Sequence, residues 1–84
     1  MTKSLLIVLM RTRRASAVRV QKILTDFGCN IKTRLGIHDG VLNKCSDAGL
    51  IVLELVGTKK ENKKLSSGLS KIPGVKTRLI DISL

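Results

Sequence analysis

Three arginines form the first cluster of chemical interest in this chain of 84 residues. Arg11, Arg13 and Arg14 stand just before a segment with helical spacing, and Ser16 adds a hydroxyl group nearby. Cations at a helix N-terminus oppose the helix dipole by roughly 0.3–1 kcal/mol each. Guanidinium groups and N-terminal amides both bind phosphate or carboxylate oxygens, so a bound anion would offset that cost. The cluster indicates either an anion site or a loop of solvated arginines.

A second basic cluster contains four lysines, Lys59, Lys60, Lys63 and Lys64. The whole chain carries sixteen Lys and Arg against six Asp and Glu, a formal net charge of +10. Such a balance is typical of proteins that bind nucleic acid, anionic metabolites or an acidic protein, and also of a solvated basic surface. Phe27 is the only aromatic residue, which argues against stacking on single-stranded nucleic acid.

Few side chains could ligate a metal. His38 and Cys45, with Cys29 and Asp47, carry the right donor atoms, but one histidine and one or two cysteines would close a site only between subunits. Cys29 is more simply a small, partly buried residue behind a helix end. We therefore expect no metal and no cofactor.

Glu54 is the one charged residue in the apolar run Leu50–Val56. An unpaired buried carboxylate is costly, so we expect a cross-strand or cross-subunit partner, such as Arg34, Lys76 or Arg78. As a general acid or base, Glu54 lacks a companion acid, histidine or nucleophile. The sequence predicts no catalytic residue, and hence a protein that is not an enzyme.

The length and the cysteine content bound the class of protein. Residues 1–84 predict a single small domain, near the size at which one core stabilises a fold only marginally. Two cysteines are too few for a disulfide framework, and the first apolar run is too short to span a bilayer. We expect a cytoplasmic protein that gains stability by oligomerisation, with no membrane contact.

The spacing of apolar residues predicts six elements. In chain order they are a strand Ser4–Met10, a helix from about Ala15 that stops at Gly28, a strand Asn30–His38, a strand Leu50–Val56, a helix opened by Gly57 and Thr58 and stopped by Pro73-Gly74, and a strand Val75–Leu84. Thr58 and Glu61 predict a capping box at the second helix, and Gly28 a C-terminal glycine cap at the first. The turn-forming residues Asp39–Gly49 predict a loop, and the alternation before it places Ile31, Thr33, Leu35 and Ile37 on one face.

This order predicts an α+β fold, the ferredoxin-like βαββαβ sandwich, with a four-stranded antiparallel sheet and both helices on one face. The apolar runs Leu5–Met10 and Leu50–Leu53 would be the central strands. Both runs are apolar on both faces, whereas the helices of so short a chain cover one. A second copy is the simplest cover for the other, so we expect a homodimer or tetramer built through the open sheet face and strand edges.

The segments ILTDFGCNIKTRLG and SKIPGVKTRLIDI resemble ACT-type ligand-binding regulatory domains. The apolar first strand, ILTDFG, RLGI, an apolar third strand ending at Gly57-Thr58, and LSKIPGVK resemble more closely the small stand-alone ACT-like regulators of iron-only hydrogenase systems. The resemblance implies a non-catalytic regulatory module that dimerises, often further, and binds a small effector between subunits.

The resemblance also implies where that effector would lie. The positions that match the family's site are Met10–Ser16 of one subunit, with Arg11, Thr12, Arg13, Arg14 and Ser16, and the second strand of its partner, with Thr33, Arg34, Leu35 and Gly36. The acidic residue and Pro-Gly pair usual in the first loop are absent, so the amino acid common to ACT domains is not the expected effector. The other hypothesis is an interaction protein that holds nucleic acid or an acidic protein on its basic surface.

Overall fold

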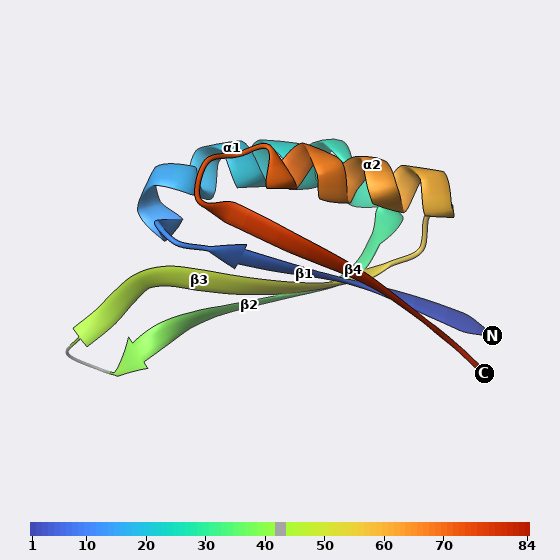
Figure 1. The fold of residues 1–84 in the computed structure, drawn as a ribbon, viewed down its shortest axis with the longest axis horizontal. Coiled ribbons are helices and arrows are strands. Elements are labelled where there is room, and N and C mark those ends of the chain that lie inside the picture. Colours follow the sequence, from blue (N-terminus) through green and yellow to red (C-terminus); the bar gives the residue numbers. More distant parts are fainter. Residues whose placement is uncertain (42–43) are drawn as a thin grey trace.

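Two helices cover one face of a four-stranded sheet in the computed structural model (Figure 1). The structure describes the backbone of residues 1–41 and 44–84, and their side chains except those of Arg13 and residues 38–47. The elements are β1 (Thr2–Met10), α1 (Arg13–Asp26), a 3-10 turn (Gly28–Asn30), β2 (Ile31–Val41), β3 (Lys44–Leu55), α2 (Lys59–Ser70) and β4 (Val75–Ser83).

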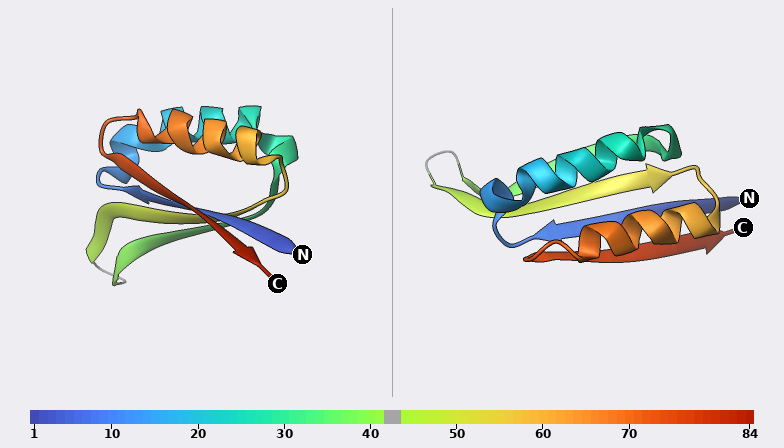
Figure 2. Two further views of the ribbon diagram at one scale, coloured as in Figure 1. Left: turned by 45° about the vertical axis from the view of Figure 1, so that its right-hand side comes forward. Right: turned by 90° about the horizontal axis from the view of Figure 1, so that it is seen from above.

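The sheet is antiparallel throughout, with the strand order β2-β3-β1-β4. The two apolar runs are therefore the central strands β1 and β3, and β2 and β4 are the edges. Seen from above, α1 lies over the β2–β3 side of the sheet and α2 over the β1–β4 side (Figure 2). The predicted α+β ferredoxin-like fold is confirmed.

The core lies between the sheet and the helices. Leu6 and Leu53 form a cross-strand pair at its centre, and both are fully buried. The other buried apolar side chains come from β1, β3, β4, both helices and the turn after α2: Val8, Met10, Val20, Leu24, Ile51, Leu55, Leu65, Leu69, Ile72 and Val75. Alternate residues of β1 and β3 supply the core, so those between them point to the opposite face.

The helix ends match the sequence at α2 and differ at α1. The Thr58 Oγ1 accepts from the Glu61 amide at 3.1 Å, and a Glu61 carboxylate oxygen accepts from the Thr58 amide at 3.0 Å, which confirms the capping box. The predicted glycine cap at Gly28 is wrong. The chain tightens into a 3-10 turn in which the Asn30 amide donates to the Phe27 carbonyl, so no left-handed residue is needed. Gly74, at φ +79°, is the left-handed glycine that turns the chain into β4.

The β2–β3 hairpin departs from the predicted loop at 39–49. The strands keep pairing to Val41 and Lys44, beyond the end of the helices (Figure 1). A two-stranded ribbon that extends away from the core does not need apolar and polar side chains to alternate along it. The amino-acid composition of residues 39–49 therefore does not indicate a strand. A register shift between Ile31 and Thr33 also turns Ile31 toward the core, so its predicted face is wrong.

The sheet face opposite the helices is uncovered in the single chain, and we call it the open face. Its apolar residues are Leu5, Ile7, Leu9, Leu35, Ile37, Leu50, Val52, Val56, Ile80 and Ile82. Leu9, Leu35 and Ile82 are each more than half exposed, at 51%, 54% and 54%. In the part of the chain that is described, no helix is long and apolar enough to cross a membrane.

Candidate functional site

The β1–α1 connection is held against the turn before β4. The Arg11 amide donates to the Gly74 carbonyl at 2.8 Å. Arg11 and Lys76 line a hollow of about 610 Å³ at this junction, together with Leu9, Met10, Ala48, Gly74 and Val75. We call it the junction hollow. It brings two cations to the position that the family resemblance assigns to the effector.

The other described side chains of the predicted loop site, those of Thr12, Arg14 and Ser16, do not line the junction hollow. Arg14 belongs to the first turn of α1, as does Arg13, whose side chain lies outside the described residues. Thr12 is the N-cap residue, but its side chain makes no capping hydrogen bond. Ser16 is 2% exposed, so within one chain its hydroxyl group does not face the solvent.

The predicted second-strand residues divide between the two faces of the sheet. Thr33 and Leu35 pair with Glu54 and Val52 of β3 and lie on the open face. Arg34 and Gly36 pair with the buried Leu53 and Ile51, so they lie on the helix side. β2 therefore contributes residues to both faces of the sheet, and Arg34 and Gly36 lie on the face that the helices of their own subunit cover.

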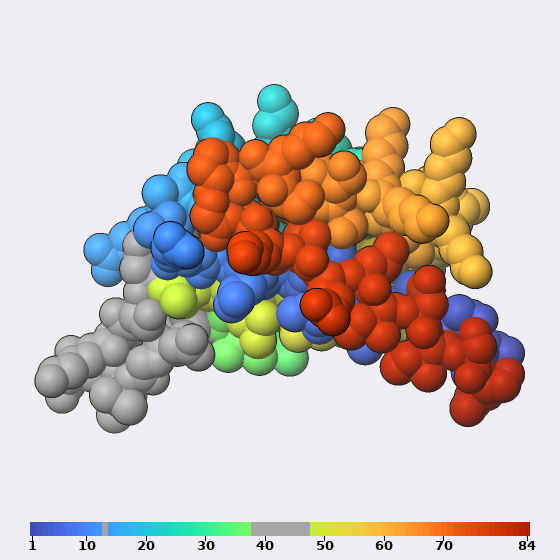
Figure 3. Space-filling view, in the orientation of Figure 1, coloured from blue at the N-terminus to red at the C-terminus, as the bar shows by residue number. Residues whose placement is uncertain are grey.

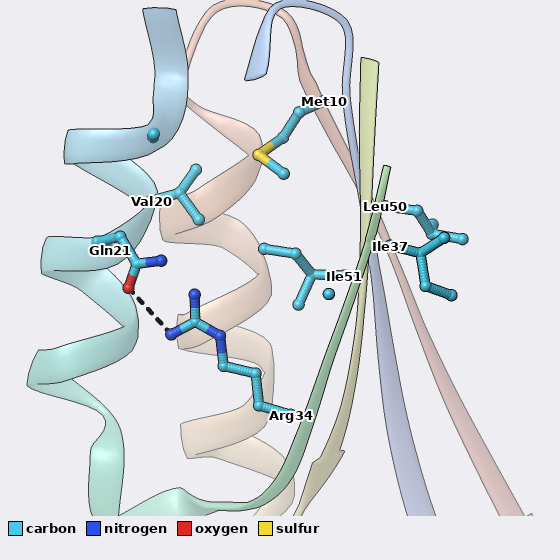
Figure 4. Close-up of a pocket in the computed structure, with 9 residues that line it drawn as sticks. Met10, Val20, Gln21, Arg34, Ile37, Leu50 and Ile51 are labelled. Atoms are coloured by element: carbon cyan, nitrogen blue, oxygen red, sulfur yellow. Dashed lines mark hydrogen bonds between the residues drawn. The ribbon is translucent and has the colours of Figure 1, made fainter. Parts of the chain in front are cut away.

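Arg34 lines a pocket of about 330 Å³ between α1 and the sheet (Figure 4). We call it the Arg34 pocket. Met10, Val20 and Ile51 point into the space between helix and strands, whereas Ile37 and Leu50 point away from the helix (Figure 4). The described residues that line it are Met10, Ala17, Val20, Gln21, Arg34, Gly36, Ile37, Leu50 and Ile51. Met10 also lines the junction hollow, so one buried side chain separates the two sites.

Gln21 positions the guanidinium of Arg34. The Arg34 Nη1 donates to the Gln21 Oε1 at 3.0 Å, across the gap between β2 and α1. The sequence prediction missed Gln21, Ala17, Val20 and Ile51. The spacing of Ala17 and Gln21 on one helix face was a usable signal, but nothing in the sequence indicated that this face lies beside Arg34 rather than over the core.

Glu54 has a different partner from those predicted. Its carboxylate forms a salt bridge with Lys3 at 3.0 Å and lies 3.5 Å from the Thr33 hydroxyl, on the open face. The hydrogen bond from Lys3 lowers the pKa of Glu54 below its ordinary value of 4.5. Lys3 is on the neighbouring strand β1, within reach of the carboxylate, whereas Arg34 faces the helices. The predicted cross-strand partner is therefore present, but within one chain it is Lys3 and not Arg34, Lys76 or Arg78.

The outer surface of the two helices is strongly basic. Long side chains project from it, away from the sheet (Figure 3). The exposed cations of α1 and α2 are Arg14, Arg19, Lys22, Lys59, Lys60, Lys63 and Lys64, with Lys71 directly after α2, and we call this surface the helix layer. Glu61 is the one acid of α2, and its carboxylate is engaged by Thr58 and by Asn30 at 3.1 Å. These hydrogen bonds hold the Glu61 carboxylate at the N-terminal end of α2.

The residues considered for a metal site give no cluster that can be described. Cys29 is exposed in the 3-10 turn, so its predicted partial burial is wrong. His38, Cys45 and Asp47 have side chains outside the described residues. Elsewhere in the described chain, no three His, Cys, Asp or Glu side chains lie together as metal ligands would.

Comparison with models of protein families and with curated proteins finds no match. Solved structures are similar. An uncharacterized protein, TM1266 from Thermotoga maritima, has a TM-score of 0.82 at 21% identity, over 99% of this chain and 100% of that one. The apo form of CPII, a nitrogen regulatory PII-like protein from Thiomonas intermedia K12, has a TM-score of 0.65 at 14% identity, over 100% and 92%. CPII bound to ADP, AMP and bicarbonate has a TM-score of 0.56 at 12% identity, over 99% and 97%. At these identities the likeness establishes the shared fold.

Proposed function

We propose that the chain is a non-catalytic regulatory module that assembles through its open face and binds a small anionic effector beside Met10. The observation that carries the proposal is the pairing of two features in one small fold. An apolar sheet face lacks a cover, and cations line two hollows at the end of the same strand, β1. Assembly and ligand binding would then be coupled through β1, because an effector shifts an equilibrium by its differential affinity for the two states.

A second copy of the chain is the proposed cover of the open face. Four strands about 4.8 Å apart, with about seven paired residues at about 3.3 Å each, make a face of roughly 450 Å² in projection. Two such faces approach the area of a specific protein interface, about 1,000 Å² or more. Exposed apolar patches of this size are often functional, and larger ones mark interaction sites. The face also carries Lys76 and Arg78, which a partner's Glu54 could neutralise at its margin.

The effector is proposed to bind at the junction hollow, with the partner's second strand completing the site. The ligands named for CPII, which are ADP, AMP and bicarbonate, are anions. This supports a search for the effector among anionic ligands. A thermal-shift screen of nucleotides, phosphorylated metabolites and amino acids tests the proposal. A true effector should stabilise the wild type and stabilise the triple variant Arg11→Ala, Arg13→Ala, Arg14→Ala much less. A screen without any stabilising compound would contradict the effector proposal.

The regulated process is proposed to be an iron-only hydrogenase system. The resemblance in ILTDFG, RLGI and LSKIPGVK supports this assignment. Deletion of the gene should change the level or activity of the host's iron-only hydrogenase, and reintroduction of the wild-type chain should restore it. An unchanged level and activity of the hydrogenase under all growth conditions would contradict the assignment.

A second candidate function rests on the helix layer. Its cations include the pairs Lys59 and Lys63, and Lys60 and Lys64, which are neighbours on the helix surface and repel one another. A polyanion such as nucleic acid, or an acidic protein, would relieve that repulsion. Nucleic-acid affinity of this kind falls steeply with salt. Undetectable binding to duplex and single-stranded nucleic acid at low salt would exclude nucleic acid as the partner.

A further inference from the structure

We propose that the Arg34 pocket binds a small carboxylate with a short apolar tail and no amino group. This inference rests on the proposal that the chain binds a small anionic effector, and it names a ligand class and a second site. The described lining residues come from β1, α1, β2 and β3. Among the described residues, the lining shares only Met10 with that of the junction hollow, so the two sites are distinct.

The shape of the pocket suits a small organic molecule. Its volume of about 330 Å³ falls at the lower end of the range for ligand sites. Gly36 leaves the strand side open, since an added Cβ there would meet no atom within 4 Å. Met10, Val20 and Ile51 supply apolar contacts between the two layers (Figure 4). A tail of a few methylene groups would displace water from this space.

The charge of the pocket selects the head group. Arg34 is the one ionisable residue among the described residues of the lining, and the Gln21 Oε1 accepts a hydrogen bond from its Nη1. A guanidinium carries several N–H donors in a planar fork, so it can still take a carboxylate when one N–H is used by Gln21. The described residues of the lining include no carboxylate, and the Gln21 oxygen already accepts from Arg34. An ammonium group on the ligand would lose its hydration without an anionic partner.

Titration of the isotope-labelled protein with hexanoate, followed by methyl and amide NMR, tests the proposal. The methyl signals of Met10, Val20 and Ile51 should shift together, and those of Leu9 and Val18, outside the pocket, should not. Affinity should rise about fourfold for each methylene from butyrate to hexanoate, as expected for burial of apolar surface. Hexanol, which lacks the charge, and norleucine, which adds an ammonium group, should each bind at least tenfold more weakly.

Three variants locate the binding. Arg34→Gln should weaken the affinity for hexanoate by roughly tenfold or more, because it removes a charge-assisted hydrogen bond. The affinity for hexanol should stay unchanged. Gly36→Val should fill the pocket and weaken both probes. Lys32→Gln, which removes a cation from the same strand outside the lining, is the matched control and should bind hexanoate like the wild type.

Two results would overturn the inference. One is the absence of shifts at Met10, Val20 and Ile51 up to the solubility of hexanoate. The other is equal affinity of wild type and Arg34→Gln, since binding would then not use the guanidinium. If hexanoate does not bind while another anion stabilises the wild type through the Arg11 loop, the Arg34-pocket proposal is rejected and the proposed effector function stands. If no anion acts at either site, the proposed effector function falls with it.

Discussion

Replacement of Val52 by lysine should separate the subunits without unfolding them. Val52 lies on the open face and pairs with Ile7 of β1 and Leu35 of β2, so its neighbours on both sides are apolar. In a single chain a lysine there can extend its ammonium group into water along its apolar stem. In the assembled protein the same group would be buried between two sheets.

The magnitude follows from the symmetry of the assembly. An ion buried without a partner costs several kcal/mol, and a face-to-face dimer would bury one from each subunit. At about 3 kcal/mol per ion, association weakens by about 6 kcal/mol, or roughly four powers of ten in the dissociation constant. The Val52→Lys protein should therefore be a monomer wherever the wild type is associated.

Sedimentation equilibrium measures this directly, against a chain mass of 9.2 kDa. Val18→Lys is the matched control, because it makes the same replacement on the outer side of α1, where Val18 is 80% exposed. It should leave the mass unchanged. Circular dichroism should show that both variants keep their secondary structure. Equal masses for wild type, Val18→Lys and Val52→Lys would refute the reasoning, since the open face would then not be the interface.

Three further predictions concern the fold that carries the site. Thr58→Ala should lower the free energy of unfolding by about 1 kcal/mol because α2 loses its side-chain cap, whereas Ser67→Ala, at an exposed position of the same helix, should change it little; equal losses in urea unfolding would contradict the capping role. Leu65→Ala should cost about 2–5 kcal/mol because Leu65 is fully buried, and a loss below 1 kcal/mol would mean that α2 packs less closely than described. The pKa values of Glu54 and Glu61 are both lowered, mainly by the hydrogen bonds from Lys3 and Thr58, so the folded state favours the charged forms; their stabilisation is present above the ordinary value of 4.5 and should be lost as the pH falls through the lowered values. The double variant Glu54→Gln, Glu61→Gln should show a shallower loss of stability on acidification, and an unchanged slope would exclude both carboxylates as its source.

The architecture of the sheet could be predicted because the central strands carry an unambiguous signal. Leu5–Met10 and Leu50–Leu53 are apolar on both faces, as expected for central strands whose two faces are both covered. The cap of α2 was equally readable, since Thr58 and Glu61 stand at the spacing that a capping box requires.

The errors arose where long-range pairing decides the outcome. The bulge between Ile31 and Thr33 reverses the face of Ile31, and it depends on the register against β3 rather than on local sequence. The same register sends Arg34 to the helix side and leaves Lys3, from a strand far away in sequence, to pair with Glu54. The meeting of Gln21 and Arg34 required the position of α1 over the sheet, which residue spacing alone does not determine.

The exposure of the open face in the wild-type protein tests the central claim most directly. A soluble paramagnetic gadolinium chelate broadens the methyl signals that it can approach. Leu9 and Leu35 are 51% and 54% exposed in the single chain, and Val18 is 80% exposed on the helix layer. If subunits meet through the open face, the signals of Val18 should broaden while those of Leu9 and Leu35 remain sharp. Broadening of Leu9 and Leu35 in step with Val18 would mean that the face is bare in solution, and would contradict the account.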